Sequence, residues 1–463
     1  MMTLKQIMHW LGGGQLFGDE NVSVRHINTD TRTLSSGDLF IAIQGERFDG
    51  NLFLAQAKTQ GATAAIVHRG LADAGLAGVE VADTKRALGQ IAAGWREQFT
   101  LPLVAVTGSN GKTTVTQMLA SIFYAYKDEA SLATVGNLNN DIGVPLTLLR
   151  LTDKHEIGVI ELGMNHPGEI AYLANLTKPT IALVNNAQRE HLEFMSTVEA
   201  VAYENGAALS GLPQDGIAIF PADDEYAVIW QQLAVDRPTM TFSMLGDATV
   251  RCTGAVWRNG LWHVMAETPI GSIEYSLSIA GRHNVKNSLA ALTCALAAGV
   301  PQISIVKGLQ DFRPVAGRSN AHTISWFNRE IMLIDDTYNA NPDSMRAAID
   351  VLAELGSPRL LVLGDMGEVG EHGAQFHAEI GEYAMAKNIE KLFTIGSLAK
   401  ESSKHFPTSR HFENKDALLA AVLAELPQIN SILVKGSRFM KMEQVVRVIM
   451  SEAKSSMEQI HAA

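Results

Sequence analysis

The chain has 463 residues, of which 46% are hydrophobic and 19% are charged, a balance that is typical of globular proteins and excludes an intrinsically disordered chain. At roughly 150 residues per domain, this length predicts about three domains. Lys and Arg total 37 against 49 for Asp and Glu. The resulting net charge of −12 argues against a nucleic-acid-binding protein, which normally carries a basic stripe.

The sequence lacks the features of a membrane or secreted protein. No apolar run approaches the ~18–20 residues of a membrane span, and the opening MMTLKQIMHWLGGG has no apolar core of signal-peptide length. The two cysteines, Cys252 and Cys294, cannot build a disulfide framework, and we interpret both as small buried apolar residues. We therefore expect a cytoplasmic protein without a membrane span.

Short apolar runs alternate with longer amphipathic stretches, which predicts repeated β-α units and largely parallel sheets. Turn-rich stretches near residues 99–102 and 312–318 mark two joins and give predicted domains at 1–98, 99–312 and 313–463. Residues 249–278 are less regular and predict antiparallel strands. The predicted parallel strands are residues 40–43, 64–67 and 79–81; then 103–106, 157–162 and 181–184; then 331–335, 360–363, 392–395 and 431–434.

The second domain opens with VAVTGSNGKTT at residues 104–114, where a short apolar run leads into a glycine-containing loop. Apolar residues recur at helical spacing over residues 112–127, so the loop precedes a predicted helix whose exposed N–H groups suit an anion. Lys112 would neutralise phosphates and the Thr113 hydroxyl would bind Mg²⁺. Only two residues separate Gly108 from Gly111, instead of the four of the standard phosphate loop, and an ordinary strand–helix turn is the alternative.

Two later stretches supply candidate partners for this loop. VIELGMNHPGEIA (159–171) places Glu161 at a strand end, where its carboxylate could bind Mg²⁺; a solvent-exposed strand-end residue is the alternative. NNAQREHLEF (185–194) contains His191, a candidate metal or phosphate contact whose alternative is a plain surface or core histidine.

The third domain offers IDDTYNANPDSM (334–345), with Asp336 at a strand end. Asn341 followed by Pro342 predicts a helix N-cap with proline at the first helical position. The acidic cluster exceeds what a cap needs and could orient a ribose or an amine. In GRHNVKN (281–287), Asn284 could contact a base or cap a helix, and Arg318 in AGR (316–318) could contact phosphate or lie solvated in a linker.

TGSNGKTT, VIELGMNHPGEIA, GRHNVKN, AGR and DDTYNANP, in this order and spacing, resemble the Mur ligase family over nearly the whole chain. The resemblance implies an α/β fold with three domains: a smaller N-terminal α/β domain that binds the UDP-substrate, a central ATP-binding P-loop-type domain, and a C-terminal Rossmann-like domain. The central sheet is expected to be mainly parallel, with helices on both faces. The C-terminal domain is expected to bind the incoming dipeptide and part of ATP.

Residues 28–53 resemble the uridine-nucleotide domain of the family members that add the third residue or the terminal dipeptide. The Asp-Asn-Pro-Arg motif of the meso-diaminopimelate-adding member is absent, whereas DDTYNANPDSM and LVLGDMGEVGEHG (361–373) resemble the dipeptide-adding member. This resemblance implies an ATP-dependent, ADP-forming ligase that joins D-alanyl-D-alanine to UDP-N-acetylmuramoyl-tripeptide through an acyl phosphate. Another Mur-type ligase, a P-loop kinase or NTPase, and a non-enzymatic nucleotide-binding scaffold remain alternatives.

The resemblance also implies the site residues and the ligands, ATP and Mg²⁺, in a monomer that acts on small molecules. The implied catalytic residues are Lys112, Glu161, His191 and Arg318, and the implied metal ligands are Thr113, Glu161 and His191. The implied ATP contacts are Thr107, Gly108, Ser109, Asn110, Gly111, Lys112, Thr113, Thr114, Asn284, Arg318, Asp336 and Asn339. The implied substrate contacts are Asp30, Thr31, Arg32, Gly45, Phe48 and Asp49, with the loop 45–50, and Asn341 and Arg438.

One position departs from the family pattern. Many members carry a carbamylated lysine after the histidine, and the aligned residue here is Asn205, so we predict no carbamylated lysine. Glu204 is a candidate substitute for the missing carboxylate, although adjacent helical residues point about 100° apart.

Overall fold

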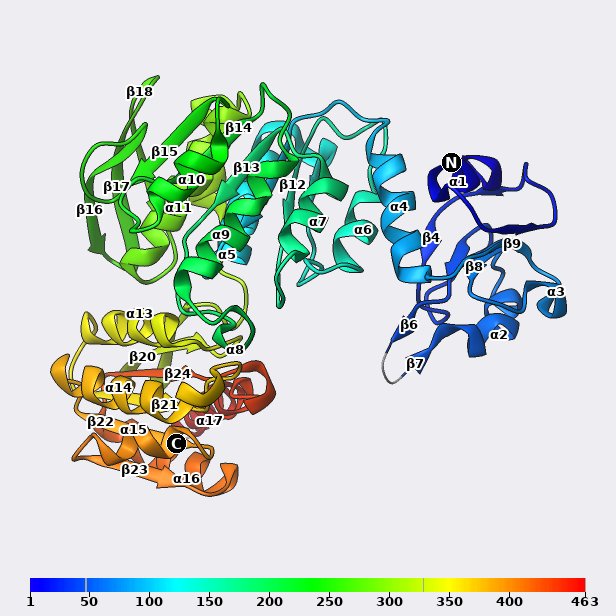
Figure 1. Ribbon diagram of the computed structural model, residues 1–463. Coiled ribbons are helices and arrows are strands. Elements are labelled where there is room, and N and C mark those ends of the chain that lie inside the picture. The colour runs from blue at the N-terminus through cyan, green and yellow to red at the C-terminus, as the bar shows by residue number, and fades with distance from the viewer. Residues whose placement is uncertain (46–47, 328, 463) are drawn as a thin grey trace.

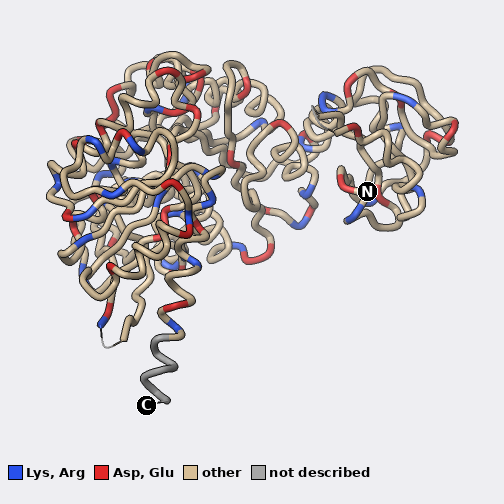
Figure 2. Tube along the Cα trace, turned by 90° about the horizontal axis from the view of Figure 1, so that it is seen from below, with Lys and Arg blue, Asp and Glu red and all other residues tan. Residues whose placement is uncertain are grey.

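The computed structural model describes residues 1–45, 48–327 and 329–462 (Figure 1). Three sheets with covering helices follow one another along the chain, which confirms the predicted α/β class. The limits at 98 and 312 stay predictions, and the first, central and third domains are residues 1–98, 99–312 and 313–463. Basic and acidic residues are interspersed along the trace (Figure 2). Within the described part of the chain, no helix combines the length and apolar character needed to cross a membrane.

The first domain contains a five-stranded sheet whose two faces carry separate cores. The strand order is β2 (Gln15–Phe17), β9 (Ala77–Glu80), β8 (Ala64–Val67), β5 (Leu39–Ile41) and β4 (Ile27–Asn28). The helices are α1 (Leu4–Leu11), α2 (Leu54–Thr59), α3 (Leu71–Ala74) and α4 (Thr84–Arg96), and two small ladders pair β1 (Met2–Thr3) with β3 (Ser23–Val24) and β6 (Gln44–Gly45) with β7 (Phe48–Asp49). Leu39 and Ile41 face the core under α1 and α4, whereas Phe40 between them faces α2 and α3.

Helix α4 connects the first domain to the central one (Figure 1). Asp83 caps its N-terminus by accepting hydrogen bonds from the backbone N–H groups of Lys85 and Arg86. At its other end, the buried Arg96 donates hydrogen bonds of 2.9 Å and 3.0 Å to the carbonyls of Thr177 and Lys178. The Arg96 bonds attach the C-terminal end of α4 to the central domain.

The central domain is built on a nine-stranded sheet that is parallel from β11 to β16 and antiparallel from β16 to β18, as predicted for residues 249–278. The predicted helix 112–127 matches α5 residue for residue. The strand order is β11 (Ser131–Ala133), β12 (Ile157–Glu161), β10 (Leu103–Thr107), β13 (Ile181–Val184), β14 (Ile217–Pro221), β15 (Thr239–Ser243), β16 (Val250–Arg258), β17 (Leu261–Thr268) and β18 (Gly271–Leu277).

Helices cover both faces of this sheet, because residues along β10 alternate between two cores. Val104 and Val106 pack with one set of helices, and Leu103 and Ala105 with the other. The first set is α5 (Lys112–Lys127), α11 (Arg282–Ala297) and α12 (Gln302–Asp311). The second includes α6 (Gly143–Leu148), α7 (Glu169–Thr177), α9 (Val198–Gly206) and α10 (Ala227–Ala234), and the short α8 (Leu192–Met195) follows the loop after β13.

The third domain has a six-stranded sheet in which only the β19–β20 pair is antiparallel. The strand order is β19 (Asn320–Trp326), β20 (Arg329–Asp336), β24 (Ser431–Lys435), β21 (Arg359–Leu363), β22 (Lys391–Ile395) and β23 (Ser409–Phe412). The helices are α13 (Pro342–Ala353), α14 (Gly373–Ala386), α15 (Ala399–Lys404), α16 (Lys415–Glu425) and α17 (Glu443–Ala462). Leu361 faces α13 and α14, and Val362 faces α16 and α17, so this sheet is also covered on both sides.

Candidate functional site

A polar cleft of about 600 Å³ runs between the central and third domains, at the carboxyl ends of β10, β12 and β13. Crevices at this end of parallel strands are where α/β proteins bind ligands. At the far side the cleft reaches Asp141 and Tyr172, which contact α4 of the first domain. The predicted site residues that line it are Ser109, Asn110, Gly111, Lys112, Thr113, Thr114, Glu161, His191, Asn284, Arg318, Asp336, Asn339, Asn341 and Arg438.

The loop after β10 has the tight geometry that its glycines predict. Gly108 and Gly111 have φ angles of 132° and 82°, in the region that disfavours side chains. A Cβ at Gly111 would also lie 2.5 Å from Asn287 Oδ1. Thr107 and Gly108 lie beneath the cleft, where both donate hydrogen bonds to Asn205 Oδ1, at 2.7 Å and 2.9 Å.

Asparagine side chains of the NNAQREHLEF stretch, which were not among the predicted site residues, hold this loop from the end of β13. Asn186 Oδ1 accepts a 2.9 Å hydrogen bond from the backbone N–H of Asn110. Asn185 donates to the Asn110 carbonyl at 2.8 Å and to Asn287 at 2.9 Å. Asn287 in turn donates to Asn284 Oδ1 at 2.9 Å, so the predicted base contact Asn284 belongs to a hydrogen-bonded chain that begins at the loop.

Lys112 lies in the loop with its ammonium group enclosed. Its Nζ donates to the carbonyls of Gly108 and Ser109, at 2.6 Å and 3.0 Å, and forms an ion pair with Glu190 at 2.8 Å. Glu190 was not among the predicted site residues, although a carboxylate next to a predicted site histidine is a signal that could have been followed. In this arrangement Glu190 occupies the position beside Lys112 that an anionic ligand would take.

Glu161 provides the best-formed candidate cation contact. Its side chain is 1% exposed, and Oε1 accepts hydrogen bonds from Thr113 Oγ1 at 3.1 Å and from Asn139 Nδ2 at 2.7 Å. Among the described residues, Oε2 is buried without a hydrogen-bond partner. A buried carboxylate oxygen with no partner is unfavourable unless a cation or water completes it.

A hydroxyl and a carboxylate on neighbouring elements fit Mg²⁺, which prefers oxygen ligands and retains several waters and substrate phosphates. No cluster of three or more acidic, histidine or cysteine side chains capable of holding a metal occurs within the part of the chain that the structure describes. The donor set of Thr113 and Glu161 therefore suits a metal that arrives with a nucleotide rather than a permanently caged ion.

His191 lies between two carboxylates. Its Nε2 is 3.5 Å from Glu190 Oε1, and its Nδ1 is 2.7 Å from Glu368 Oε2 of the third domain. Burial alone would lower the pKa of His191, but contacts with Glu190 and Glu368 outweigh it and raise the pKa to about 9. A protonated imidazole has no free lone pair, so metal binding by His191 would require the metal to displace that proton; its metal role stays a prediction.

The third domain contributes a basic wall to the cleft. The Arg318 guanidinium stacks 3.9 Å from the Tyr338 ring, and the exposed Arg438 lies 5.3 Å from the same ring. Arg318 Nε is buried without a partner among the described residues. Asp336 accepts hydrogen bonds from the Ser319 backbone N–H at 2.9 Å and from Lys435 at 2.6 Å. The backbone carbonyl of Asn339 accepts another hydrogen bond from Lys435.

Asn341 is the N-cap of α13, as predicted: its Oδ1 accepts from the Ser344 backbone N–H at 2.8 Å. The same side chain also donates to Asn110 Oδ1 at 3.0 Å across the cleft. A loop residue of the central domain therefore contacts the helix start of the third domain.

The predicted substrate contacts of the first domain lie outside this cleft. Arg32 forms an ion pair with Asp30 at 2.6 Å, and the hydrogen bonds from Arg32 lower the pKa of that carboxyl to about 2. Thr31 is buried beside them. Gly45 pairs with Phe48, and the exposed Phe48 ring stacks on Phe53 with 5.2 Å between the ring centres. Asp49 caps the turn that follows. Residues 46–47 of the predicted loop lie outside the described residues.

The position of Glu204 differs from the one that a substitute for the carbamylated lysine would need. Its carboxylate accepts hydrogen bonds of 2.9 Å from the backbone N–H groups of Gly168 and Ile170, at the start of α7. This capping role directs Glu204 away from the cleft and contradicts the hypothesis that it replaces the family's carbamylated lysine. The aligned Asn205 points to the phosphate loop instead, because adjacent helical positions diverge by about 100°.

Three stretches of the chain match known domain families. Residues 23–96 match "Mur ligase family, catalytic domain", residues 106–295 match "Mur ligase middle domain", and residues 322–438 match "Mur ligase, glutamate ligase domain". The chain is 41% identical over 452 residues to an Escherichia coli (strain K12) protein, with 97% of this chain and 98% of that protein covered. The chain belongs to the Mur ligase family.

The named relatives of this Mur ligase share one description. The E. coli protein is named UDP-N-acetylmuramoyl-tripeptide–D-alanyl-D-alanine ligase, and so is a Haemophilus influenzae protein that is 40% identical, with 93% of this chain and 95% of that protein covered. A crystal structure of MurF from Acinetobacter baumannii is 35% identical with a TM-score of 0.90, covering 97% of this chain and 98% of the other. MurF ligase from Thermotoga maritima in complex with ADP is 25% identical with a TM-score of 0.82, covering 94% and 100%.

Proposed function

We propose that this Mur ligase joins D-alanyl-D-alanine to UDP-N-acetylmuramoyl-tripeptide in peptidoglycan precursor synthesis, with ATP converted to ADP and phosphate. One observation carries the proposal: a phosphate loop, a buried carboxylate oxygen without a partner among the described residues and the basic wall of another domain line one cleft. Nearly full-length relatives at 41% and 40% identity carry this ligase name, which supports the choice of substrates.

The central domain would bind the ATP phosphates. Residues 108–114 would surround them with backbone N–H groups, and Lys112 would exchange its ion pair with Glu190 for the terminal phosphates. Thr113 and Glu161 would hold Mg²⁺, which supplies charge neutralisation at the phosphates when bound. Asn284 would contact the base, and Asp336 the ribose side of the nucleotide.

The reaction would proceed in two steps. The terminal carboxylate of the tripeptide attacks the γ-phosphorus and releases ADP, and the amine of D-alanyl-D-alanine then attacks the acyl carbon and releases phosphate. Phosphate is a far better leaving group than the oxide that direct attack on a carboxylate would require. Lys112 and Arg318 would stabilise the negative charge that develops on the transferred group, while Arg438 would serve the dipeptide side.

The first domain would hold the uridine nucleotide through Asp30, Thr31, Arg32, Gly45, Phe48 and Asp49. The cleft supports this arrangement because it extends to Asp141 and Tyr172, which contact α4 of that domain. We further propose a cytoplasmic monomer whose ligands are these small molecules rather than nucleic acid. A sedimentation mass of twice the 50.0 kDa chain would contradict the monomer.

The test is phosphate release with two substrate pairs. UDP-N-acetylmuramoyl-tripeptide with D-alanyl-D-alanine should release phosphate, and UDP-N-acetylmuramoyl-dipeptide with a free amino acid should not. The reverse result would identify a third-residue ligase, and release without any amine would identify an NTPase or kinase. Oxygen-18 in the tripeptide carboxylate should appear in the released phosphate, and unlabelled phosphate would refute the acyl phosphate.

A further inference from the structure

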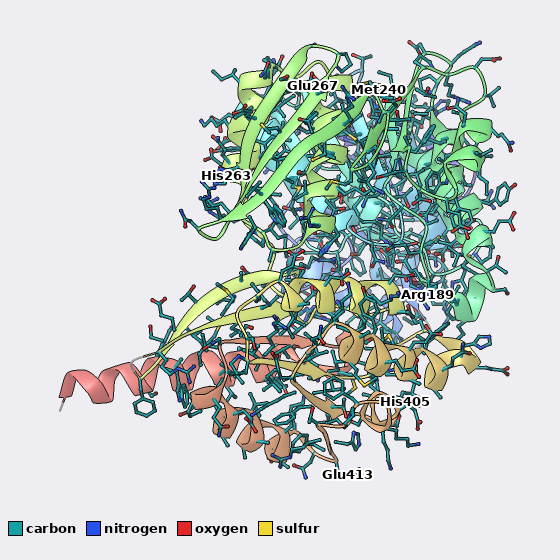
Figure 3. All side chains as sticks on the ribbon, turned by 90° about the vertical axis from the view of Figure 1, so that its left-hand side faces the viewer. Arg189, Met240, His263, Glu267, His405 and Glu413 are labelled. Carbon is teal, nitrogen blue, oxygen red and sulfur yellow. The ribbon has the colours of Figure 1, made fainter. Side chains whose placement is uncertain are left out.

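One arginine ties the loop after β13 to the third domain. The Arg189 guanidinium donates hydrogen bonds from Nη2 to Asp343 Oδ1 of α13 at 2.7 Å and from Nε to Asp343 Oδ2 at 3.2 Å. A third bond runs from Nη1 to Glu379 Oε2 of α14 at 2.9 Å. The backbone N–H of Arg189 donates another hydrogen bond, of 2.9 Å, to Asp343. Figure 3 labels Arg189 at the level where the central domain meets the third.

This contact differs from an ordinary surface ion pair. The side chains of Arg189 and Asp343 retain 19% and 24% exposure, and the guanidinium lies 5.4 Å from the centre of the Phe376 ring. Two parallel hydrogen bonds in a partly desolvated setting give both strength and a defined orientation. By comparison, Arg282 of the central domain also pairs with Glu354, the residue that follows α13, but these side chains are 64% and 49% exposed and 3.4 Å apart.

The residues on either side of Arg189 contact the phosphate loop. Before it, the Gln188 backbone N–H donates to Ser109 Oγ at 2.9 Å, and Gln188 Oε1 accepts from Asn110 at 2.7 Å. After it, Glu190 pairs with Lys112 at 2.8 Å. A displacement of Arg189 would therefore be transmitted to the loop on both sides.

We propose that Arg189 is a positioning residue, whose bonds to Asp343 and Glu379 make the contacts of Gln188 with the phosphate loop depend on docking of the third domain. The proposal deepens the ligase function above and rests on it for its catalytic consequence. Arg189 does not line the cleft and acts through its neighbours. With the third domain undocked, the hydrogen bonds to Asp343 and Glu379 are lost, and the segment around Arg189 loses its outer support.

A second contact works in the same direction. Asn341, which caps α13 two residues before Asp343, exchanges hydrogen bonds with Asn110 at 3.0 Å and 3.3 Å. The phosphate loop and the loop after β13 therefore meet the same helix start. Docking of that one helix would set both loops, so phosphoryl transfer would occur only when the domain that receives the dipeptide is in place.

The experiment compares matched variants. Arg189→Ala should lower kcat for phosphate release about tenfold or more, as loss of a desolvated charge-pair partner does, and raise the ADP dissociation constant less than about threefold, because residues 108–114 remain intact. Arg189→Lys should recover part of kcat, since it keeps the charge but not the two-pronged geometry. Asp343→Asn should behave like Arg189→Ala, and the double variant should be no worse than either single one. The control Glu354→Gln removes an exposed carboxylate that follows the same helix and should leave kcat within about twofold.

Backbone hydrogen exchange gives a readout independent of turnover. In Arg189→Ala, exchange at residues 186–192 should accelerate about tenfold or more while exchange within α5 stays unchanged. Unchanged exchange at 186–192, or kcat within about twofold of the parent, would overturn the coupling. If Arg189→Ala does not fold, Arg189→Lys and Asp343→Asn carry the test. An absence of D-alanyl-D-alanine-dependent turnover in the parent would refute the proposed function, while the exchange data would still decide the coupling.

Discussion

Replacing Glu161 by Gln should stabilise the metal-free protein while removing its response to Mg²⁺. Gln keeps the shape of the side chain and the oxygen that accepts from Thr113 and Asn139. It removes a negative charge from a site that is 1% exposed, where the second oxygen lacks a partner among the described residues. The Glu161 charge therefore lowers the free energy of unfolding when Mg²⁺ is absent and raises it when Mg²⁺ is bound.

The structure sets the size of the effect. An unsatisfied buried polar group costs about 1–3 kcal/mol, and more when it is charged. The amide nitrogen that Glu161→Gln introduces would itself lack an acceptor, so we expect a net gain of only about 1 kcal/mol. For a domain of this size, that corresponds to a rise of about 2–4 °C in melting temperature.

Thermal unfolding in EDTA, and again with ADP and saturating Mg²⁺, provides the assay. The parent should gain about 2.7 kcal/mol from ADP and Mg²⁺ at a hundredfold excess over the dissociation constant, whereas Glu161→Gln should gain much less from added Mg²⁺. The control is Glu156→Gln, which changes an exposed carboxylate just before β12. This variant should neither raise the melting temperature in EDTA nor reduce the response to Mg²⁺. A variant that melts lower than the parent in EDTA yet keeps the full Mg²⁺ response would refute the reasoning.

Three further outcomes are expected. Lys112→Ala should reduce phosphate release at least about a hundredfold, because it removes the charge that faces the transferred group. An isotope assay that found more than about one hundredth of the parent rate would contradict this role. Gly111→Ala should weaken ADP binding about tenfold or more in calorimetry, because a Cβ would lie 2.5 Å from Asn287 Oδ1 at a φ of 82°; unchanged affinity would show that the loop relaxes freely. Burial lowers the pKa of His377, whose Nε2 accepts from the Met366 N–H, so the unfolded chain binds protons more readily. The free energy of unfolding should therefore fall as pH drops below about 6.5, and His377→Gln should flatten that slope in urea titrations.

Local periodicity predicted the elements well where a single residue pattern decides them. The apolar spacing over residues 112–127 gave the bounds of α5, and the runs at 64–67 and 181–184 gave β8 and β13. Edges were less accurate: the run predicted at 40–43 is β5 at Leu39–Ile41, which begins one residue earlier and ends two residues earlier. β14 was not predicted although its run IAIFP is as apolar as that of β13, and β15, in which polar residues alternate with apolar ones, was not predicted either.

The candidate site divides in the same way. Motif residues such as Lys112 and Glu161 were selected because spacing and strand ends are visible in one dimension. Asn139 was not selected, since an ordinary amide acquires its role from a partner far along the chain. Glu190 lies next to His191, but its pairing with Lys112 spans 78 positions. Asn341 shows both cases: its cap is local and was predicted, whereas its bond to Asn110 spans 231 positions and depends on how two domains meet.

Helix α4, fixed at one end by Arg96 and at the other by Lys85 on Asp141, keeps the first domain at a set distance from the cleft. If that domain holds the uridine nucleotide, the peptide must stretch from there to the phosphate loop before its terminal carboxylate can react. A peptide that is one residue too short would not bring its terminal carboxylate to Lys112, however tightly its uridine nucleotide bound. A join that keeps this length would select peptides by their length as well as by the chemistry of their last residue.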